Sequence, residues 1–570
     1  MSLGPQCWRC RKRRLRCDSS LPSCRKCLAA DVHCPGYGDK KPVAWRDPLV
    51  LTNRGVVRIR DPKETRTSSP SAPASVLGIV CRSPRTAGSE MDLRIAADAI
   101  EYYNHKVAPD LVPYATTPSP FQVSPRQVGE LAVYLRNAYI SIAALHRHVS
   151  GEPSVLFRLA ANDNRVSPRS VACSHARSEA AASGDLDLLC LIRMGDFKSV
   201  HFASQAAAFK ALGEELHRYQ TGGLTDDFGP SIFLGIIVML SSQIQFSAYA
   251  PWQSHIDGAW SLVQAHGGLE VAARMDVELC RLLQQFALLD IFGMTTHRLS
   301  KVTAETIISR AVPYASIFHD SGVDSRNPWR LIPNQLAKVL IRINVLRAQN
   351  VLFAKASPRT DGLSAILDHL DGLSPTRWAA DEMSTNTTAL LAPSDLSEDQ
   401  ETKDAWVALM TAYRNAAILY AISSLTSLGG TSASGIIDLQ DPAPCCAERQ
   451  LTAYHALLAS LHVLFDQRSR RRRDHGTNGS SKSAATSAGL LHKFVIWPMV
   501  ITGIHSALVY HDQDATRFLC SEMQAVGEEL GTVSMIDGAR IVERLELGRE
   551  RGRDVSSWDD LFDGAPLFFM

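Results

Sequence analysis

The stretch Cys7–Cys34 reads C-W-R-C-R-K-R-R-L-R-C-D-S-S-L-P-S-C-R-K-C-L-A-A-D-V-H-C and decides how the N-terminal end of the chain folds. Its six cysteines have the spacing C-x2-C-x6-C-x6-C-x2-C-x6-C, and they are interleaved with eight basic and two acidic residues. Positive charges at this density repel one another, so the segment needs an internal cross-link and an external anionic partner. The whole chain of 570 residues carries a formal net charge of only +2, which shows how strongly charge is concentrated here.

The cysteine spacing indicates a metal cluster. A C-x2-C pair brings two sulfurs to one cation within a tight turn, and thiolates favour tetrahedral zinc at about 2.3 Å. Six thiolates complete two four-coordinate sites only if two sulfurs are shared. The repeated C-x2-C-x6-C unit predicts two similar halves about such a shared centre. We therefore predict that two zinc ions are bound by six cysteines: Cys7, Cys10, Cys17, Cys24, Cys27 and Cys34.

A disulfide knot is the alternative interpretation of six close cysteines. No apolar segment follows Met1, which argues against a secretory signal, and the most apolar run, Ile232–Leu240, is far shorter than the roughly 20 residues that span a bilayer. We therefore expect a soluble, intracellular protein with reduced thiols and no membrane partner. The other seven cysteines are scattered and are interpreted as ordinary thiols: Cys81, Cys173, Cys190, Cys280, Cys445, Cys446 and Cys520.

The Cys7–Cys34 segment, including Pro22 between its halves, resembles the fungal zinc binuclear cluster (Zn₂Cys₆) DNA-binding domain. The resemblance implies a small, loop-rich cluster with two short helices and double-stranded DNA as the anionic partner. It implies one zinc site made of Cys7, Cys10, Cys17 and Cys24. It implies a second zinc site made of Cys7, Cys24, Cys27 and Cys34, so that Cys7 and Cys24 bridge the two ions.

The arginines that follow Cys10 suit the major groove of DNA. Guanine offers N7 and O6 to one guanidinium, and each good bidentate pair discriminates by about 1–3 kcal/mol. Proteins of the resembled family read CGG-like triplets with the third and fourth residues after the second cysteine, which here are Arg13 and Arg14. Phosphate contacts, which add affinity and salt sensitivity, are assigned to Arg11, Arg16, Arg25 and Lys26. A nuclear localisation signal without base reading is the alternative interpretation.

The rest of the chain predicts a mostly α protein. Residues 35–90 are punctuated by proline and serine, which is typical of a disordered, flexible linker. No sustained heptad follows the cysteines, so monomeric DNA binding and dimerisation through the larger domain both stay open. From residue 91 apolar residues recur at helical spacing, which predicts a large all-α domain over 91–550 behind the cluster at 7–34.

Three segments carry this helical pattern most clearly, and their tryptophans, with Trp497, are expected in the core. The first follows a capping-box start at Ser124-Pro125 and has the stripe Val128, Leu131, Leu135, Ala138 and Ile142. The second ends at Gly267-Gly268, which suits a helix C-cap, and has the stripe Trp252, Ile256, Ala259 and Val263. The third has the stripe Trp406, Met410, Tyr413, Ala417 and Tyr420.

Three stretches of this body resemble the fungal-specific transcription factor regulatory domain: S-H-I-D-G-A-W-S-L-V-Q-A-H-G-G, T-A-Y-R-N-A-A-I-L-Y and I-W-P-M-V-I-T-G. The resemblance implies a regulatory or effector-sensing domain in a nuclear transcription factor for RNA polymerase II. It implies coactivators or corepressors as partners and a possible homodimer. Regulators of this kind often control metabolic or secondary-metabolite gene clusters.

Two other functions are weighed against this interpretation. The body could be a ligand-gated sensor that binds a small-molecule effector between its helices. It could also be an enzyme that carries a zinc module. The sequence contains no H-E-x-x-H, Walker-type G-x-x-x-x-G-K or G-x-S-x-G motif, and its histidines show no metal-ligand spacing, so we expect no enzyme.

One basic segment and one acidic segment also carry predictions. Residues 467–487 begin with Arg468 and Arg470–Arg473 and continue in glycine, serine and alanine, which predicts a flexible basic loop, with a second nuclear localisation signal as the alternative. Residues 551–570 alternate aspartate with aromatic residues, which is typical of disordered activation segments. The alternative for this acidic-aromatic tail is that it packs back on the helical body.

Overall fold

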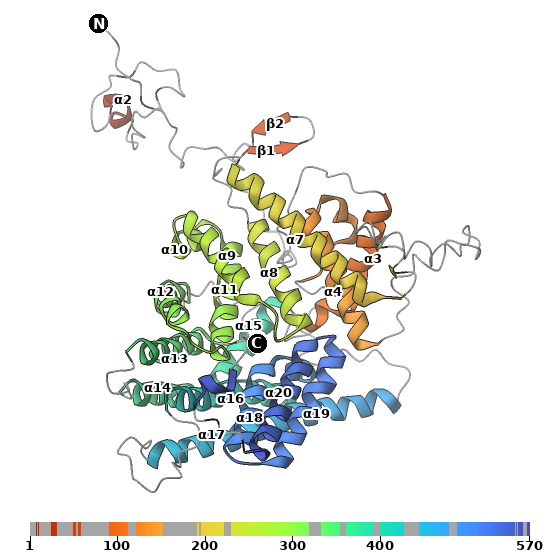
Figure 1. The fold of residues 1–570 in the computed structure, drawn as a ribbon. Helices are drawn as coiled ribbons and strands as arrows, with labels where there is room; N and C mark the ends of the chain where they lie inside the picture. The colour runs from red at the N-terminus through yellow and green to blue at the C-terminus, as the bar shows by residue number, and fades with distance from the viewer. Residues whose placement is uncertain are drawn as a thin grey trace, which may run out of the picture. The chain divides into compact units, whose positions relative to one another are not determined.

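The computed structural model divides into two compact units, Met1–Ala72 and Pro73–Met570, which are taken separately (Figure 1). It describes residues 7, 10, 17, 24–30, 49–52, 55–58, 90–111, 121–151, 188, 191–192, 195–221, 230–318, 332–353, 361–390, 400–426, 444–477, 487–552, 555, 557–562 and 567–569. The helical content of these residues confirms the prediction of a mostly α protein with a large all-α domain.

The first unit contains a short helix and a hairpin. Helix α2 spans Arg25–Leu28, and strand β1 (Leu49–Thr52) pairs antiparallel with strand β2 (Gly55–Arg58). In this register Val50 lies opposite Val57, and β-branched residues favour extended backbone. The hairpin lies inside the predicted linker, for which the sequence pattern predicts no strands.

The second unit is built from helices alone among its described residues. None of these helices combines the length and the apolar character that crossing a bilayer would require. In chain order the elements, with 3₁₀ helices marked η, are α3 (Glu90–Lys106), η3 (Ala108–Leu111), η4 (Pro125–Glu130), α4 (Val133–Ser150), α7 (Phe197–Thr221), α8 (Pro230–Phe246), α9 (Trp252–Ala265), α10 (Leu269–Met275), α11 (Val277–Thr295), α12 (Lys301–Ile317), α13 (Asn334–Leu352), α14 (Asp361–Gly372), α15 (Pro375–Leu390), α16 (Gln400–Leu425), α17 (Pro444–Thr477), η7 (Ser487–Phe494), α18 (Ile496–Leu508), α19 (Gln513–Leu530), α20 (Val533–Glu550) and η8 (Asp559–Phe562).

Helices α11 and α16 form the centre of the second unit. Helix α11 contacts α8, α9, α10, α12 and α13, while α16 contacts α13, α14, α15, α17 and α18 (Figure 1). Every residue from Gln284 to Thr295 in α11 is buried, and so is every residue from Asn415 to Ser423 in α16. A helix that is buried on all sides is mostly apolar, and the few polar side chains in these two segments, such as Asp290 and Asn415, need hydrogen-bond partners inside the protein.

Two of the three predicted helices are confirmed, and the third begins later than predicted. Helices α9 and α16 bury the predicted stripes, and Gly267 and Gly268 adopt positive φ after α9. The predicted capping box at Ser124 is wrong: the Ser124 side chain makes no cap hydrogen bond, and only the 3₁₀ turn η4 follows. Leu131 then takes extended backbone before α4 begins. The five residues of the predicted stripe are all buried, although Val128 and Leu131 lie before α4.

The predicted loop at 467–487 is also wrong at its start, because helix α17 continues to Thr477. The Arg468 side chain is 7% exposed and forms ion pairs with Glu522 at 2.6 Å and Glu529 at 2.9 Å. Arginine is a good helix former, and two carboxylates on α19 compensate for the burial of its charge. The side chains of Arg470–Arg473 and residues 478–486 lie outside the description.

The C-terminal aromatic residues pack into the helical core, which supports the alternative interpretation of the tail. Trp558, Phe562, Phe568 and Phe569 are each less than 5% exposed. The Trp558 ring packs edge-on against Tyr420 at 5.4 Å, and the backbone N–H of Phe568 donates to the carbonyl of Ala248 at 2.9 Å. Activation segments need exposed aromatics, so the disordered interpretation does not hold for these described residues.

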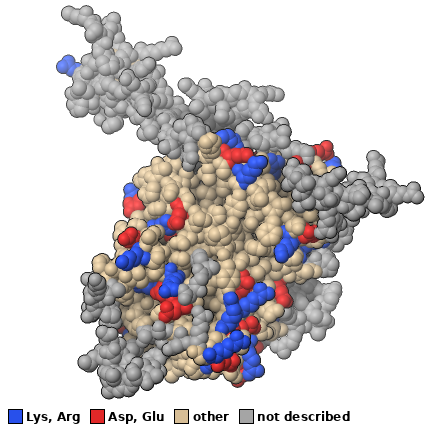
Figure 2. All heavy atoms as spheres, in the orientation of Figure 1, with Lys and Arg blue, Asp and Glu red and all other residues tan. Residues whose placement is uncertain are grey.

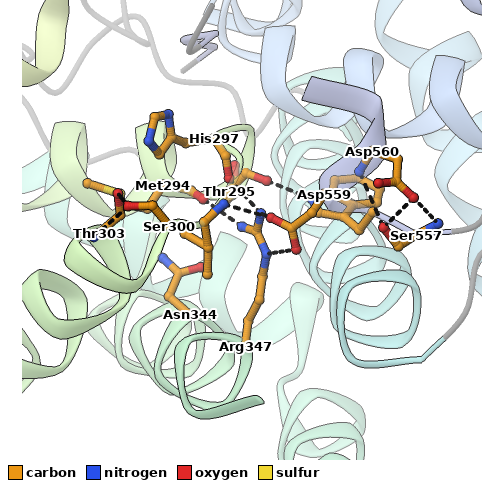
Figure 3. A network of polar contacts seen from close by, with 12 residues as sticks. Met294, Thr295, His297, Ser300, Thr303, Asn344, Arg347, Ser557, Asp559 and Asp560 are labelled. Atoms are coloured by element: carbon orange, nitrogen blue, oxygen red, sulfur yellow. Dashed lines mark hydrogen bonds and ion pairs between the residues drawn. The ribbon is translucent and has the colours of Figure 1, made fainter. Parts of the chain in front are cut away.

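One buried cation joins this tail to the central helices (Figure 3). Arg347 of α13 is 2% exposed and pairs with Asp559 of the tail at 2.6 Å. Its guanidinium also donates to the carbonyls of Met294 at 2.8 Å and His297 at 2.6 Å, at the C-terminal end of α11. The last carbonyls of a helix lack partners within the helix and carry partial negative charge, so a cation is favoured there.

Residues of the tail also form hydrogen bonds at the C-terminal end of α11. The indole N–H of Trp558 donates to the carbonyl of Thr295 at 2.8 Å, and the Thr295 hydroxyl donates to the carbonyl of Phe292 at 2.6 Å. The backbone N–H of Leu299 donates to Asp559 at 2.8 Å. The buried end of α11 is therefore satisfied by residues from α13 and from the last residues of the chain.

We expect Asp559→Ala to lower the free energy of unfolding by about 2–3 kcal/mol, because it leaves the Arg347 charge buried without its counterion. The loss is set below that of a fully buried pair because the Asp559 side chain is 27% exposed. Urea unfolding followed by circular dichroism measures the effect.

The matched control is Asp514→Ala, which removes one partner of an ion pair whose two side chains are 76% and 91% exposed. Exposed pairs contribute about 0–1 kcal/mol, so this variant should unfold close to the unmodified chain. Equal effects of the two substitutions would contradict the proposed importance of Asp559.

Candidate metal centre

Five of the six predicted cysteine ligands lie within the described residues, and their sulfurs gather at one point. The Sγ atoms of Cys7, Cys10, Cys17 and Cys24 all lie within 4.8 Å of one another. The Sγ of Cys7 is 3.6 Å from that of Cys24 and 3.8 Å from that of Cys27. The Sγ of Cys10 is 3.7 Å from that of Cys24. Cys34, the sixth predicted ligand, lies outside the described residues.

These separations fit thiolates around tetrahedral zinc. Sulfurs bound at about 2.3 Å in a tetrahedron are separated by about 3.8 Å. A disulfide would bring two sulfurs to about 2.05 Å, so none of the measured pairs is a disulfide bond. The disulfide alternative therefore fails for the five described cysteines of the cluster.

The two C-x2-C turns repeat the same local geometry. The backbone N–H of Cys10 donates to the Sγ of Cys7 at 3.4 Å, and that of Cys27 donates to the Sγ of Cys24 at 3.4 Å. Cys24 is the N-cap of α2, so its sulfur lies at the positive end of a short helix. The N–H contact from Cys10 favours the thiolate form of Cys7, which is the form that binds a metal. Cys7 and Cys24 hold equivalent positions in the two halves.

Without a cation the thiol forms of Cys7 and Cys10 are favoured. Burial, together with the neighbouring sulfurs, raises the pKa of Cys7 well above its ordinary value and that of Cys10 to about 12. Thiolates at this spacing repel one another in a site that excludes water. Zinc binding therefore has to release protons, and the energy of metal binding is what holds the segment folded.

The predicted DNA-contacting side chains are only partly described. Arg25 lies exposed in the first turn of α2, immediately after Cys24. The side chain of Lys26 and residues Arg11, Arg13, Arg14 and Arg16 lie outside the described residues. Cys10 has helical backbone, which agrees with a helix at the point where the arginine run begins.

Many basic side chains on the described surface of the helical body have acidic neighbours. On the face in Figure 2, lysine and arginine lie close to aspartate and glutamate, and uncharged surface separates these mixed groups. Several of the pairs are one helical turn apart, such as Arg94 with Glu90 and Arg517 with Asp514. The basic cluster near the cysteines is therefore the better candidate for binding a polyanion.

Two family comparisons match the two units. Residues 6–43 match the fungal Zn(2)-Cys(6) binuclear cluster domain, and residues 99–563 match the fungal specific transcription factor domain. The binuclear cluster domain binds two zinc ions through its clustered cysteines, which agrees with the sulfur geometry described above.

Comparisons with individual proteins find related regulators. The chain is 24% identical over 576 aligned residues, covering 99% of its length and 89% of the relative, to a phomenoic acid biosynthesis cluster-specific transcriptional regulator of Leptosphaeria maculans. It is 44% identical over 41 residues, 7% of this chain and 6% of the relative, to transcription factor phomR of Diaporthe leptostromiformis. No solved structure matches the chain.

We expect Cys24→Ser to reduce the zinc content from two ions per chain to less than one, because the Sγ of Cys24 lies close to those of both Cys7 and Cys10. A hydroxyl is a far poorer ligand for zinc than a thiolate. Native mass spectrometry of the full chain counts the ions.

Cys280→Ser is the control, since it removes a half-buried thiol from helix α11 of the other unit. This variant should keep two zinc ions. Two ions retained by Cys24→Ser would show that Cys24 is not central to the cluster.

Proposed function

Because the chain belongs to the family defined by the fungal specific transcription factor domain, we propose that it regulates RNA polymerase II transcription by reading CGG-like triplets in the major groove. The chain is a DNA-binding transcription factor with a Zn₂Cys₆ cluster, and it is not an enzyme. Its base specificity, ligand assignments and targets are the proposed parts.

The close approach of the cysteine sulfurs carries this proposal. A segment as short as Cys7–Cys34 cannot bury enough apolar surface to fold by itself, so two zinc ions have to hold it. In the proposed arrangement Cys7 and Cys24 bridge the ions. Their equivalent N–H contacts and their mutual Sγ distance of 3.6 Å support this assignment.

The rigid cluster then presents the basic side chains to DNA. In the proposed interface Arg13 and Arg14 each donate two hydrogen bonds to guanine N7 and O6. Arg11, Arg16, Arg25 and Lys26 contact phosphates and set the affinity without choosing the sequence. The exposed position of Arg25 on α2 supports its assignment.

The biological setting is proposed from the relatives. The Leptosphaeria maculans protein is a regulator specific to one biosynthesis cluster, and we place this chain in the same class, as a nuclear regulator of a metabolic or secondary-metabolite gene cluster. Coactivators or corepressors would act through the helical body. A homodimer would double the DNA contacts and add specificity through half-site spacing.

We expect the double variant Arg13→Ala/Arg14→Ala to lose the preference for a CGG duplex over a scrambled duplex by about ten- to a hundredfold, because both bidentate base contacts are removed. Fluorescence anisotropy of the full chain at several salt concentrations measures both affinities. An unchanged preference for CGG would exclude base reading by these arginines.

Arg25→Ala is the matched control, because it removes one arginine assigned to phosphate. It should weaken binding to both duplexes equally and lower the slope of log affinity against log salt by about 1. A change in sequence preference would instead assign Arg25 to base contact.

A further inference from the structure

A cavity of about 160 Å³ lies where the C-terminal segment meets helix α20. Its walls combine polar and apolar surface, and the apolar part includes Ile541 and Leu545 of α20 and Phe562 and Leu567 of the C-terminal segment. Two cationic side chains, Arg544 and Arg549, also line it. Pockets with apolar walls and a few polar groups are typical of small-molecule sites.

The two arginines differ in their contacts. Arg544 donates to the hydroxyl of Tyr249, and its guanidinium lies 5.7 Å from the centre of that ring. The Nε of Arg549 is buried and has no hydrogen-bond partner among the described residues. A buried donor without a partner is costly, so Arg549 is placed to gain from an acceptor inside the cavity.

The distribution of charged residues on α20 favours an anion in the cavity. The cavity-lining residues of α20, from Ile541 to Arg549, recur at helical spacing on one face, and both lining arginines belong to it. Glu543 and Glu546 of the same helix do not line the cavity. Burial, followed by these two nearby carboxylates, raises the pKa of Cys520 on α19 to about 12.

The one carboxylate that lines the cavity already accepts hydrogen bonds. Asp560 accepts from the backbone N–H of Ser557 at 3.1 Å and from its hydroxyl at 2.7 Å. Arg544, Arg549 and Asp560 are the charged residues of the described lining, which therefore carries a net positive charge. Charge-assisted contacts to a ligand carboxylate would be stronger than neutral hydrogen bonds.

The size of the cavity limits the ligand. An engineered protein cavity of about 150 Å³ lined by leucine, isoleucine and phenylalanine holds one benzene molecule. We propose that the cavity between α20 and the C-terminal segment binds a small organic monoanion, with a ring-sized apolar body against Ile541, Leu545 and Leu567 and a carboxylate against Arg549. The site goes beyond the DNA-binding function and does not depend on it.

Occupancy of this site would act on the C-terminal segment. Phe562 and Leu567 supply part of one wall, while Asp559 in the same segment pairs with Arg347 at the end of α11. A ligand that contacts both α20 and this segment holds the segment against the body. Ligand binding therefore stabilises the native helical body by mass action.

Calorimetric titration of the full chain tests the proposal with benzoate, which combines one ring with one carboxylate. Benzylamine, with the same ring and a positive charge, and acetate, with the carboxylate and no ring, are the comparison ligands. We expect saturable binding of benzoate, no binding of benzylamine, and binding of acetate that is at least about tenfold weaker. Benzoate alone should raise the melting temperature.

The variant Arg549→Gln keeps a polar amide near the cavity, shortens the side chain and removes its charge. It should weaken benzoate binding by about tenfold or more and leave the melting temperature without benzoate unchanged, because the Nε of Arg549 has no hydrogen-bond partner among the described residues. Arg540→Gln, a 64% exposed arginine of the same helix that does not line the cavity, should bind benzoate normally.

Three results would overturn the proposal. The first is the absence of saturable benzoate binding, and the second is equal binding of benzoate and benzylamine. The third is unchanged benzoate affinity in Arg549→Gln. Each of these outcomes is independent of DNA binding by the N-terminal cluster, so the two proposals fail separately.

Discussion

The helical body depends on the buried C-terminal end of α11, where backbone carbonyls have to find donors away from water. Arg347 supplies donors to the carbonyls of Met294 and His297, and Trp558 supplies one to Thr295. Unpaired carbonyls at such a depth would cost a free energy comparable to that of lost hydrogen bonds. The positions of α13 and of the last residues of the chain follow from this requirement.

The aromatic core around α16 connects this helix end to α18. Trp497 stacks near Tyr413, packs edge-on against Tyr420, and donates its indole N–H to the Thr295 hydroxyl at 2.9 Å. Tyr420 in turn donates to Asn344 on α13 at 2.6 Å. Large rings with polar tips can therefore fill the space between four elements and still satisfy every polar atom they bring.

The N-terminal unit is stabilised in a different way from the helical body. It has too few apolar residues to form a core, and metal–sulfur bonds take the place of packing. The two units thus respond to different conditions. The cluster is sensitive to chelators and oxidants, while the body is sensitive to loss of buried contacts.

The sequence revealed those features that depend on local spacing. The cysteine register predicts the metal cluster, and period 3.6 predicts α9 and α16, because both patterns are set by neighbours in the chain. The hairpin at 49–58 and the helical course of α17 past Arg468 did not follow from local pattern. Arg468 depends on Glu522 and Glu529, which lie more than fifty residues away.

The acidic-aromatic tail is a second case in which local pattern was not enough. Its composition is that of an exposed activation segment, yet Trp558 and Asp559 have partners on α11, α13 and α16. These partners, Arg347 and the C-terminal end of α11, lie hundreds of residues earlier in the chain. A local sequence pattern therefore contains no information about them. Within the metal centre, sequence predicted which atoms gather, whereas the equivalent N–H contacts of Cys7 and Cys24 needed coordinates.

The order of translation affects how the helical body is made. Trp558 is synthesised after α11 and α16, so the Thr295 carbonyl has no indole donor until Trp558 has left the ribosome. A chain that terminates before Trp558 would leave apolar surface of the core exposed to chaperones and proteases.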